Sequence, residues 1–90
     1  MATVRIPTPL RPFTGGKEEV AIAGATVAEL VTNLGEAHPD LKARILTAEG
    51  GVRRFINLYV NDADIRTLSG VDTAVTDNDT VAIVPAIAGG

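Results

Sequence analysis

The chain has 90 residues, 46% of them hydrophobic, and a net charge of −3. This length suits one domain with one core and excludes a second domain, because independent domains usually need at least about 50 residues each. The chain has no cysteine, which excludes disulfides, thiolate metal sites and a cysteine nucleophile, and its negative charge argues against a general nucleic-acid surface.

The N-terminal segment has the pattern of two antiparallel strands. Val4 and Ile6 alternate with polar residues, and Val20 and Ile22 resume this alternation after a stretch rich in proline and glycine. Alternation with a period of two is typical of half-buried strands. We therefore predict a hairpin whose long loop includes residues 12–17.

Two helices are predicted in the next segment. Thr26 and Glu29 have the spacing of a capping box, in which the backbone N–H of Glu29 donates to Thr26 and the Glu29 carboxylate accepts from the backbone N–H of Thr26. Apolar residues then follow at helical spacing over residues 27–34. The pair His38 and Pro39 predicts a break and a second, short helix, with the apolar residues Leu41, Ile45 and Leu46.

The C-terminal third predicts two strands and a tail. Residues 55–60 have strong strand propensity, residues 61–64 have turn composition, and residues 80–84 form the last predicted strand. We expect a domain over residues 1–84 and a flexible tail over residues 85–90.

This order of elements favours an α+β fold with one mixed sheet and one main helix packed across one face. The two terminal strands would lie side by side and parallel if the helix forms the crossover between them, which is the β-grasp, or ubiquitin-like, arrangement. The predicted core consists of Val4, Ile6, Val20, Ile22, Val27, Leu30, Val31, Leu34, Leu58, Val60, Val81 and Ile83.

The end of the chain is its most informative feature. A buried strand leads directly into Pro85, Ala86, Ile87, Ala88, Gly89 and Gly90. This ending resembles that of the ThiS/MoaD family of ubiquitin-like sulfur carriers, which end in Gly-Gly after a last strand and a proline-containing tail. Residues 59–62 and 77–81 also resemble the family. Residues 6–12, 14–16 and 55–66 are more narrowly similar to the CysO-type carriers of cysteine synthesis.

The resemblance implies a carrier without catalytic groups or a bound cofactor. The Gly90 carboxylate would be adenylated by a ubiquitin-activating-type adenylyltransferase and sulfurtransferase, which uses ATP, and would become a thiocarboxylate. A pyridoxal-phosphate cysteine synthase acting on an activated serine would then accept the sulfur. Sulfur supply for molybdopterin, thiazole or tRNA thiolation is an alternative, as is a ubiquitin-like protein modifier joined through Gly90.

The composition of the tail agrees with this chemistry. Six residues extend about 20 Å, at roughly 3.4 Å each, which is enough to thread a narrow channel. Gly89 and Gly90 have no Cβ to crowd the reacting carbonyl, and they tolerate the backbone angles that a channel imposes.

A second candidate site lies on the sheet face opposite the core. If Leu58 points into the core, then Phe55 and Tyr59 point outward, as does Val84 of the last strand. These apolar side chains beside the tail predict a partner-docking patch.

Other constellations indicate no chemistry. His38 is the sole histidine and cannot form a histidine metal cluster, and the aspartates at 72, 77 and 79 have turn composition, so we expect no metal site. No apolar run approaches the roughly 18 residues that span a bilayer, and no basic segment followed by an apolar stretch opens the chain. We therefore expect no membrane or nucleic-acid partner and a cytoplasmic location.

Overall fold

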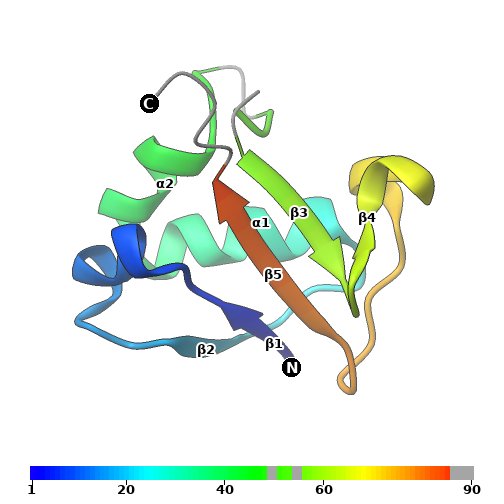
Figure 1. Ribbon diagram of the computed structural model, residues 1–90, viewed down its shortest axis with the longest axis horizontal. Helices are drawn as coiled ribbons and strands as arrows, with labels where there is room; N and C mark the ends of the chain where they lie inside the picture. Colours follow the sequence, from blue (N-terminus) through cyan, green and yellow to red (C-terminus); the bar gives the residue numbers. More distant parts are fainter. Residues whose placement is uncertain (49–50, 54–55, 86–90) are drawn as a thin grey trace.

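The computed structural model describes residues 1–48, 51–53 and 56–85, which form a mixed sheet with helices across one face (Figure 1). The five strands have the order β2-β1-β5-β3-β4. The central strands β1 and β5 are parallel, and the other neighbours are antiparallel. The predicted β-grasp arrangement is confirmed. The bounds are β1 Ala2–Arg5, β2 Glu19–Ile22, α1 Val27–Ala37, α2 Pro39–Ile45, β3 Ile56–Val60, β4 Ala63–Asp64 and β5 Thr80–Pro85.

The hairpin β1–β2 contains a 3₁₀ helix, Thr8–Thr14, where the sequence predicted only a loop. Its prolines fit because their fixed φ suits a short helical turn, and a helix this short shows no apolar period. The Nε of Arg11 donates to the carbonyl of Ile6 at 3.1 Å. The hydroxyl of Thr14 lies 3.0 Å from the carbonyl of Lys17. The Arg11 bond holds the 3₁₀ helix against the end of β1, and the Thr14 bond joins it to the segment before β2.

The helix α1 follows β2 and begins the crossover that leads to β3. The backbone N–H of Glu29 donates to the hydroxyl of Thr26 at 3.2 Å, as predicted. The second half of the predicted capping box is wrong, because the Glu29 carboxylate accepts from the backbone N–H of Ala25 at 3.3 Å rather than from Thr26. Gly24 lets the chain enter the helix closely, since a Cβ there would lie 2.7 Å from the Leu30 backbone. The predicted break at His38 is confirmed.

A two-residue turn joins β3 to β4. Asn61 and Asp62 have φ values of 49° and 75°, which asparagine and aspartate tolerate better than most residues. The Asn61 side chain donates to the carboxylate of Asp79 at 2.7 Å and accepts from the backbone N–H of Thr80 at 2.9 Å. This turn is therefore fastened to the start of β5.

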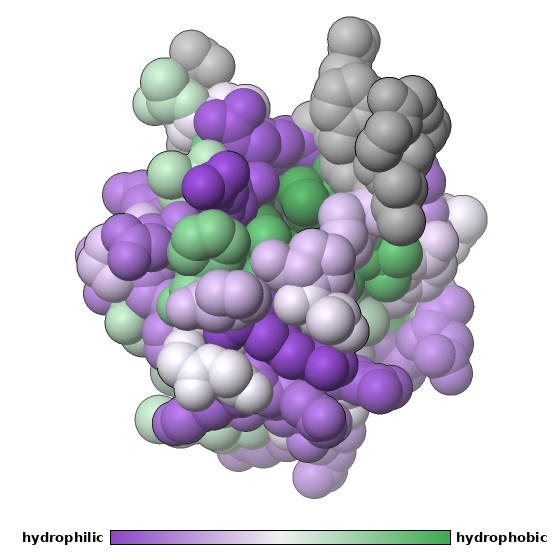
Figure 2. Space-filling model, turned by 60° about the vertical axis from the view of Figure 1, so that its left-hand side comes forward, coloured by the Kyte–Doolittle hydropathy of each residue, from purple (hydrophilic) through white to green (hydrophobic). Residues whose placement is uncertain are grey.

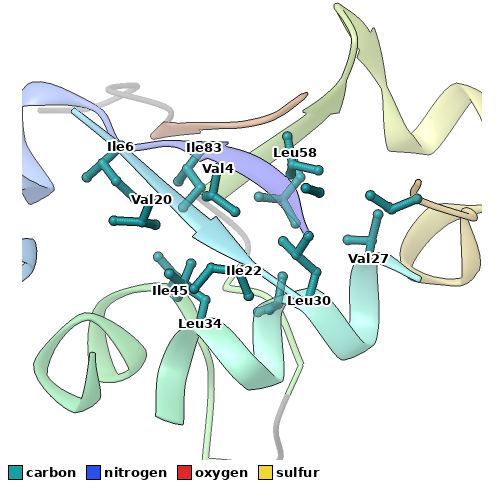
Figure 3. Close-up of a cluster of buried hydrophobic side chains, with 14 of the residues drawn as sticks. Val4, Ile6, Val20, Ile22, Val27, Leu30, Leu34, Ile45, Leu58 and Ile83 are labelled. Atoms are coloured by element: carbon teal, nitrogen blue, oxygen red, sulfur yellow. The ribbon is translucent and has the colours of Figure 1, made fainter. Parts of the chain in front are cut away.

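The core lies between the sheet and the two helices (Figure 3). Side chains of β1, β2, β3 and β5 point toward those of α1 and toward Ile45 of α2. Every residue predicted for the core is buried, and so are the three apolar residues of the second helix. The sequence missed further core residues because they lie in short segments or at a strand end without an apolar period: Ala2, Leu10, Ile65 and Val75.

Candidate functional site

The candidate tail begins at the end of β5, in the middle of the sheet. Asn57 lies opposite Val84 in the antiparallel register, and Ile56 lies opposite Pro85. Pro85 is thus the last residue of β5, whereas the sequence assigned it to the tail. A proline can close a strand because it lacks only the N–H donor and keeps its carbonyl acceptor. The other five predicted tail residues lie outside the described residues: Ala86, Ile87, Ala88, Gly89 and Gly90. Phe55 of the predicted docking patch also lies outside them.

The outer face of the sheet carries two of the three residues predicted for partner docking. Tyr59 is half-buried, and the side chain of Val84 is 42% exposed. Their strand neighbours Leu58 and Ile83 are buried in the core, 2% and 3% exposed. The predicted alternation of the two faces is therefore correct, and Ala82 lies opposite Tyr59 on the outer face. A role in docking stays a prediction.

A cavity of about 260 Å³ lies between the 3₁₀ helix and the end of β5. Two ion pairs flank it: Arg5 and Glu19 are 3.8 Å apart, and Arg11 and Glu18 are 3.9 Å apart. Val84 lines the same cavity, so these charges lie next to the end of β5, from which the tail continues. Sequence reasoning missed this group because its members come from separate segments that only folding brings together. Because each pair contains one arginine and one glutamate, the rim of the cavity has no strong preference for a positive or a negative group of a partner protein.

A third ion pair, between Asp64 and Arg66, lies beside Tyr59, which is opposite Asp64 in the sheet. The guanidinium of Arg66 donates to the carboxylate of Asp64 at 2.7 Å and 3.1 Å. These side-chain hydrogen bonds, with one from the Arg66 backbone, lower the pKa of Asp64, and the same carboxylate raises the pKa of Arg66. The pKa of Asp79 is also lowered, by hydrogen bonds from the Thr76 backbone and the Asn61 side chain.

These lowered pKa values predict a loss of stability in acid. A carboxyl group whose pKa is lower in the folded than in the unfolded state stabilises the fold above the unfolded pKa, and this contribution disappears as the pH falls through the folded pKa. Because both aspartates start from a value of 3.8, the free energy of unfolding should fall below about pH 4. Urea unfolding between pH 2.5 and 7 measures this. Asp64→Asn and Asp79→Asn should each flatten the fall, whereas Asp72→Asn, at an exposed carboxylate outside both networks, should not.

The described residues provide no metal centre. Within them, no group of three or more histidine, cysteine, aspartate or glutamate side chains could hold a metal ion. His38 is the N-cap residue of α2, and its side chain makes no capping hydrogen bond. In the same part of the chain, no helix is both long and apolar enough to cross a membrane.

Comparison with known proteins identifies the family. Residues 4–90 match the ThiS family. The sulfur carrier protein CysO of Mycobacterium tuberculosis is 42% identical over 98% of this chain and 97% of its own length. A chain in the crystal structure of the Amycolatopsis orientalis BexX/CysO complex is 47% identical, with a TM-score of 0.89 and complete coverage of both chains. The small archaeal modifier protein SAMP1 of Methanosarcina acetivorans is 27% identical, with a TM-score of 0.90 over 99% of this chain and 95% of its own.

These matches agree with the fold. The similarity to the CysO proteins extends over nearly the full length of this chain and of theirs, and the family match runs to Gly90. The chain therefore belongs to the ThiS family and is a CysO-like sulfur carrier rather than a catalyst.

Proposed function

We propose that the carboxylate of Gly90 is adenylated, converted to a thiocarboxylate and used as the sulfur donor in cysteine biosynthesis. The match to the ThiS family as far as Gly90 carries this proposal. The near-complete coverage of CysO supports the assignment to cysteine synthesis rather than to another pathway.

The chemistry requires a separate activating enzyme. A carboxylate is a poor electrophile, so one of its oxygens must first become part of a good leaving group. Its oxygen attacks the α-phosphate of ATP and releases pyrophosphate, which leaves an acyl-adenylate. A sulfur nucleophile then attacks the acyl carbon and displaces AMP, so that sulfur replaces one oxygen. The enzyme that binds ATP performs both steps, and this chain is its macromolecular substrate.

The geometry of β5 supports delivery of the tail to such an enzyme. With Pro85 in the sheet, the five residues 86–90 span at most about 17 Å when extended, at roughly 3.4 Å each. A reach of this length requires the enzyme to contact the end of the sheet closely. The outer face and the cavity beside Val84 both lie at that end.

The sulfur acceptor follows from the proposed pathway. A pyridoxal-phosphate cysteine synthase that holds an activated serine would receive the tail after the activating enzyme. The thiocarboxylate sulfur is nucleophilic: its bond to the β-carbon of the activated serine forms as the bond from that carbon to its oxygen leaving group breaks. Hydrolysis of the acyl bond to Gly90 then leaves the sulfur on the amino acid and restores the carboxylate. The protein thus alternates between two enzymes that recognise the same tail.

A protein modifier is the second candidate function. The similarity to the small archaeal modifier SAMP1 favours it, since a modifier would use the same activated terminus to acylate a lysine of a target protein. Long self-linked chains are disfavoured because the sequence has only two lysines, Lys17 and Lys42.

Intact-mass measurement separates these functions. The protein is incubated with ATP, a sulfide source and lysate of the native cell. A thiocarboxylate adds about 16 mass units, because sulfur replaces oxygen, whereas conjugation adds the mass of a protein. Loss of the shift without ATP would support adenylation. An unchanged mass with ATP present would contradict both functions.

Tyr59 tests the proposed docking patch. Tyr59→Ala should weaken binding to the activating enzyme or the acceptor by about 1–3 kcal/mol, as expected for an aromatic anchor. Isothermal titration calorimetry measures the affinity, and thermal unfolding measures the fraction folded. Val71→Ala removes an apolar side chain that is 41% exposed and lies away from the patch, and it should leave the affinity unchanged. Equal affinities of both variants and the unmodified protein would show that Tyr59 is ordinary surface.

A further inference from the structure

Three cations at one end of the molecule have no acidic partner within the described residues. Lys42, Arg44 and Arg53 are exposed and form no ion pair with another described residue. By contrast, the other three described arginines each lie within 4 Å of a carboxylate: Arg5, Arg11 and Arg66. Arg44 lies over the Phe13 ring, 4.8 Å from its centroid, so within the described residues Lys42 and Arg53 are the two of these cations left for another molecule.

Two of the three cations line one groove. Lys42 of α2 and Arg53, which precedes β3, border an open groove of about 370 Å³. Its other lining includes Pro39 and Leu46, so the charges surround a partly apolar floor. The Nε of Arg53 donates to the carbonyl of Ala43 at 3.1 Å, which fixes the guanidinium against the C-terminal end of α2. The groove has the charge and shape to receive a carboxylate on a short loop.

The groove lies near the base of the tail. The carbonyl of Arg53 accepts from the backbone N–H of Ile56 at 3.0 Å, and Ile56 is opposite Pro85 in the sheet. Figure 1 shows α2, the start of β3 and the tip of β5 at the same end of the molecule. Figure 2 turns the side that carries α2 forward, where hydrophilic residues separate small apolar areas. A protein that receives the tail must therefore pass close to Arg53.

The opposite end of β5 is acidic. Asp79 precedes the strand, and Asp62 lies in the turn whose Asn61 is bonded to Thr80. Five residues of β5 lie between Asp79 and Pro85, a distance of about 20 Å at roughly 3.3 Å per residue. An acidic partner surface is therefore attracted to the tail end and repelled from the other end, which orients the encounter.

Cations in the last turn of α2 also complement the carbonyls at its C-terminal end. That role accounts for Lys42 and Arg44 within the helix. It does not account for Arg53, which lies outside α2 and completes the open groove with Lys42.

We propose that the groove between Lys42 and Arg53 binds an acidic loop at the mouth of the channel through which the activating enzyme takes the tail. This inference rests on the proposed function and adds the contact that aligns the tail. Because charge pairs at the rim of an interface act mainly on association, the groove raises the rate of productive encounter rather than the rate of the chemical step.

The test is steady-state thiocarboxylation by the purified activating enzyme, with ATP and sulfide, at low and high salt. Lys42→Glu and Arg53→Glu should each lower kcat/KM by about tenfold at low salt through KM, with kcat unchanged. The loss should shrink to about twofold near 0.5 M salt, where charges are screened within a few ångströms. Lys42→Arg should keep nearly the full rate. Thermal unfolding confirms that each variant is folded.

Lys17→Glu is the matched control, because it makes the same change of net charge in the loop before β2. It should stay within about twofold of the unmodified protein. If Lys42→Glu and Arg53→Glu match this control, or if their loss is independent of salt, the groove is not a docking site. Failure of the unmodified protein to load any sulfur would instead contradict the proposed function itself.

Discussion

Deletion of Gly90 should abolish ATP-dependent sulfur loading while the domain stays folded. The carboxylate that remains would belong to Gly89 and would lie one residue, roughly 3.4 Å, short of the nucleotide. The free energy of unfolding should change by less than about 0.5 kcal/mol, because the last residues of a domain usually have few packed contacts. Intact-mass spectrometry measures loading, and urea unfolding measures stability.

Two further variants separate the position of the carboxylate from the width of the tail. A residue added after Gly90 should also prevent loading, since it displaces the carboxylate, unless a protease removes it. Gly89→Val keeps the terminal carboxylate in place and adds a branched side chain where the tail must be thin. Its loading should fall steeply. Full loading of the Gly90 deletion would rule out the carrier mechanism proposed for this terminus.

Truncation of the core should have the largest effect on stability. Ile83→Ala and Leu58→Ala remove buried side chains that lie opposite each other on adjacent strands. Each should cost about 2–5 kcal/mol, because the lost burial adds to the cost of a cavity. That is a large part of the roughly 5–15 kcal/mol that stabilises a typical domain. Urea unfolding measures the loss.

Val84→Ala is the control for this prediction. Val84 follows Ile83 on the same strand, but it points to the outer face and is 42% exposed. Its truncation should change the free energy of unfolding by less than about 0.5 kcal/mol. Equal losses for Ile83→Ala and Val84→Ala would mean that the two faces of β5 are assigned wrongly.

The sequence predicted those parts of the fold that depend on periodic patterns. The alternation around Val4 and Ile83 and the helical stripe around Leu30 are periodic because each element buries one side, so the inward residues could be identified directly. The parallel contact between β1 and β5 followed from the expectation that one helix forms the crossover between the first two strands and the last two.

The parts that were missed depend on contacts without a local signal. The 3₁₀ helix around Leu10 is too short for a period, and Glu29 bonds to Ala25 rather than Thr26 by a shift of one residue. Pro85 extends β5 because its carbonyl can still accept a hydrogen bond, which composition does not reveal.

The candidate site divides in the same way. The terminal glycines and the outward position of Tyr59 were accessible from the sequence, because one is a motif and the other follows from alternation. The groove between Lys42 and Arg53 was not, since the sequence does not show that Arg53 lies against the end of α2.

The most direct test of thiocarboxylate formation at Gly90 is fragment-ion mass spectrometry of the protein after reaction with ATP, sulfide and the activating enzyme. We expect a gain of about 16 mass units on every fragment that contains Gly90 and on no fragment that ends before it. The gain should disappear without ATP. A gain of sulfur at any other residue, or an unmodified Gly90 in a protein that still supplies sulfur to its acceptor, would contradict the account.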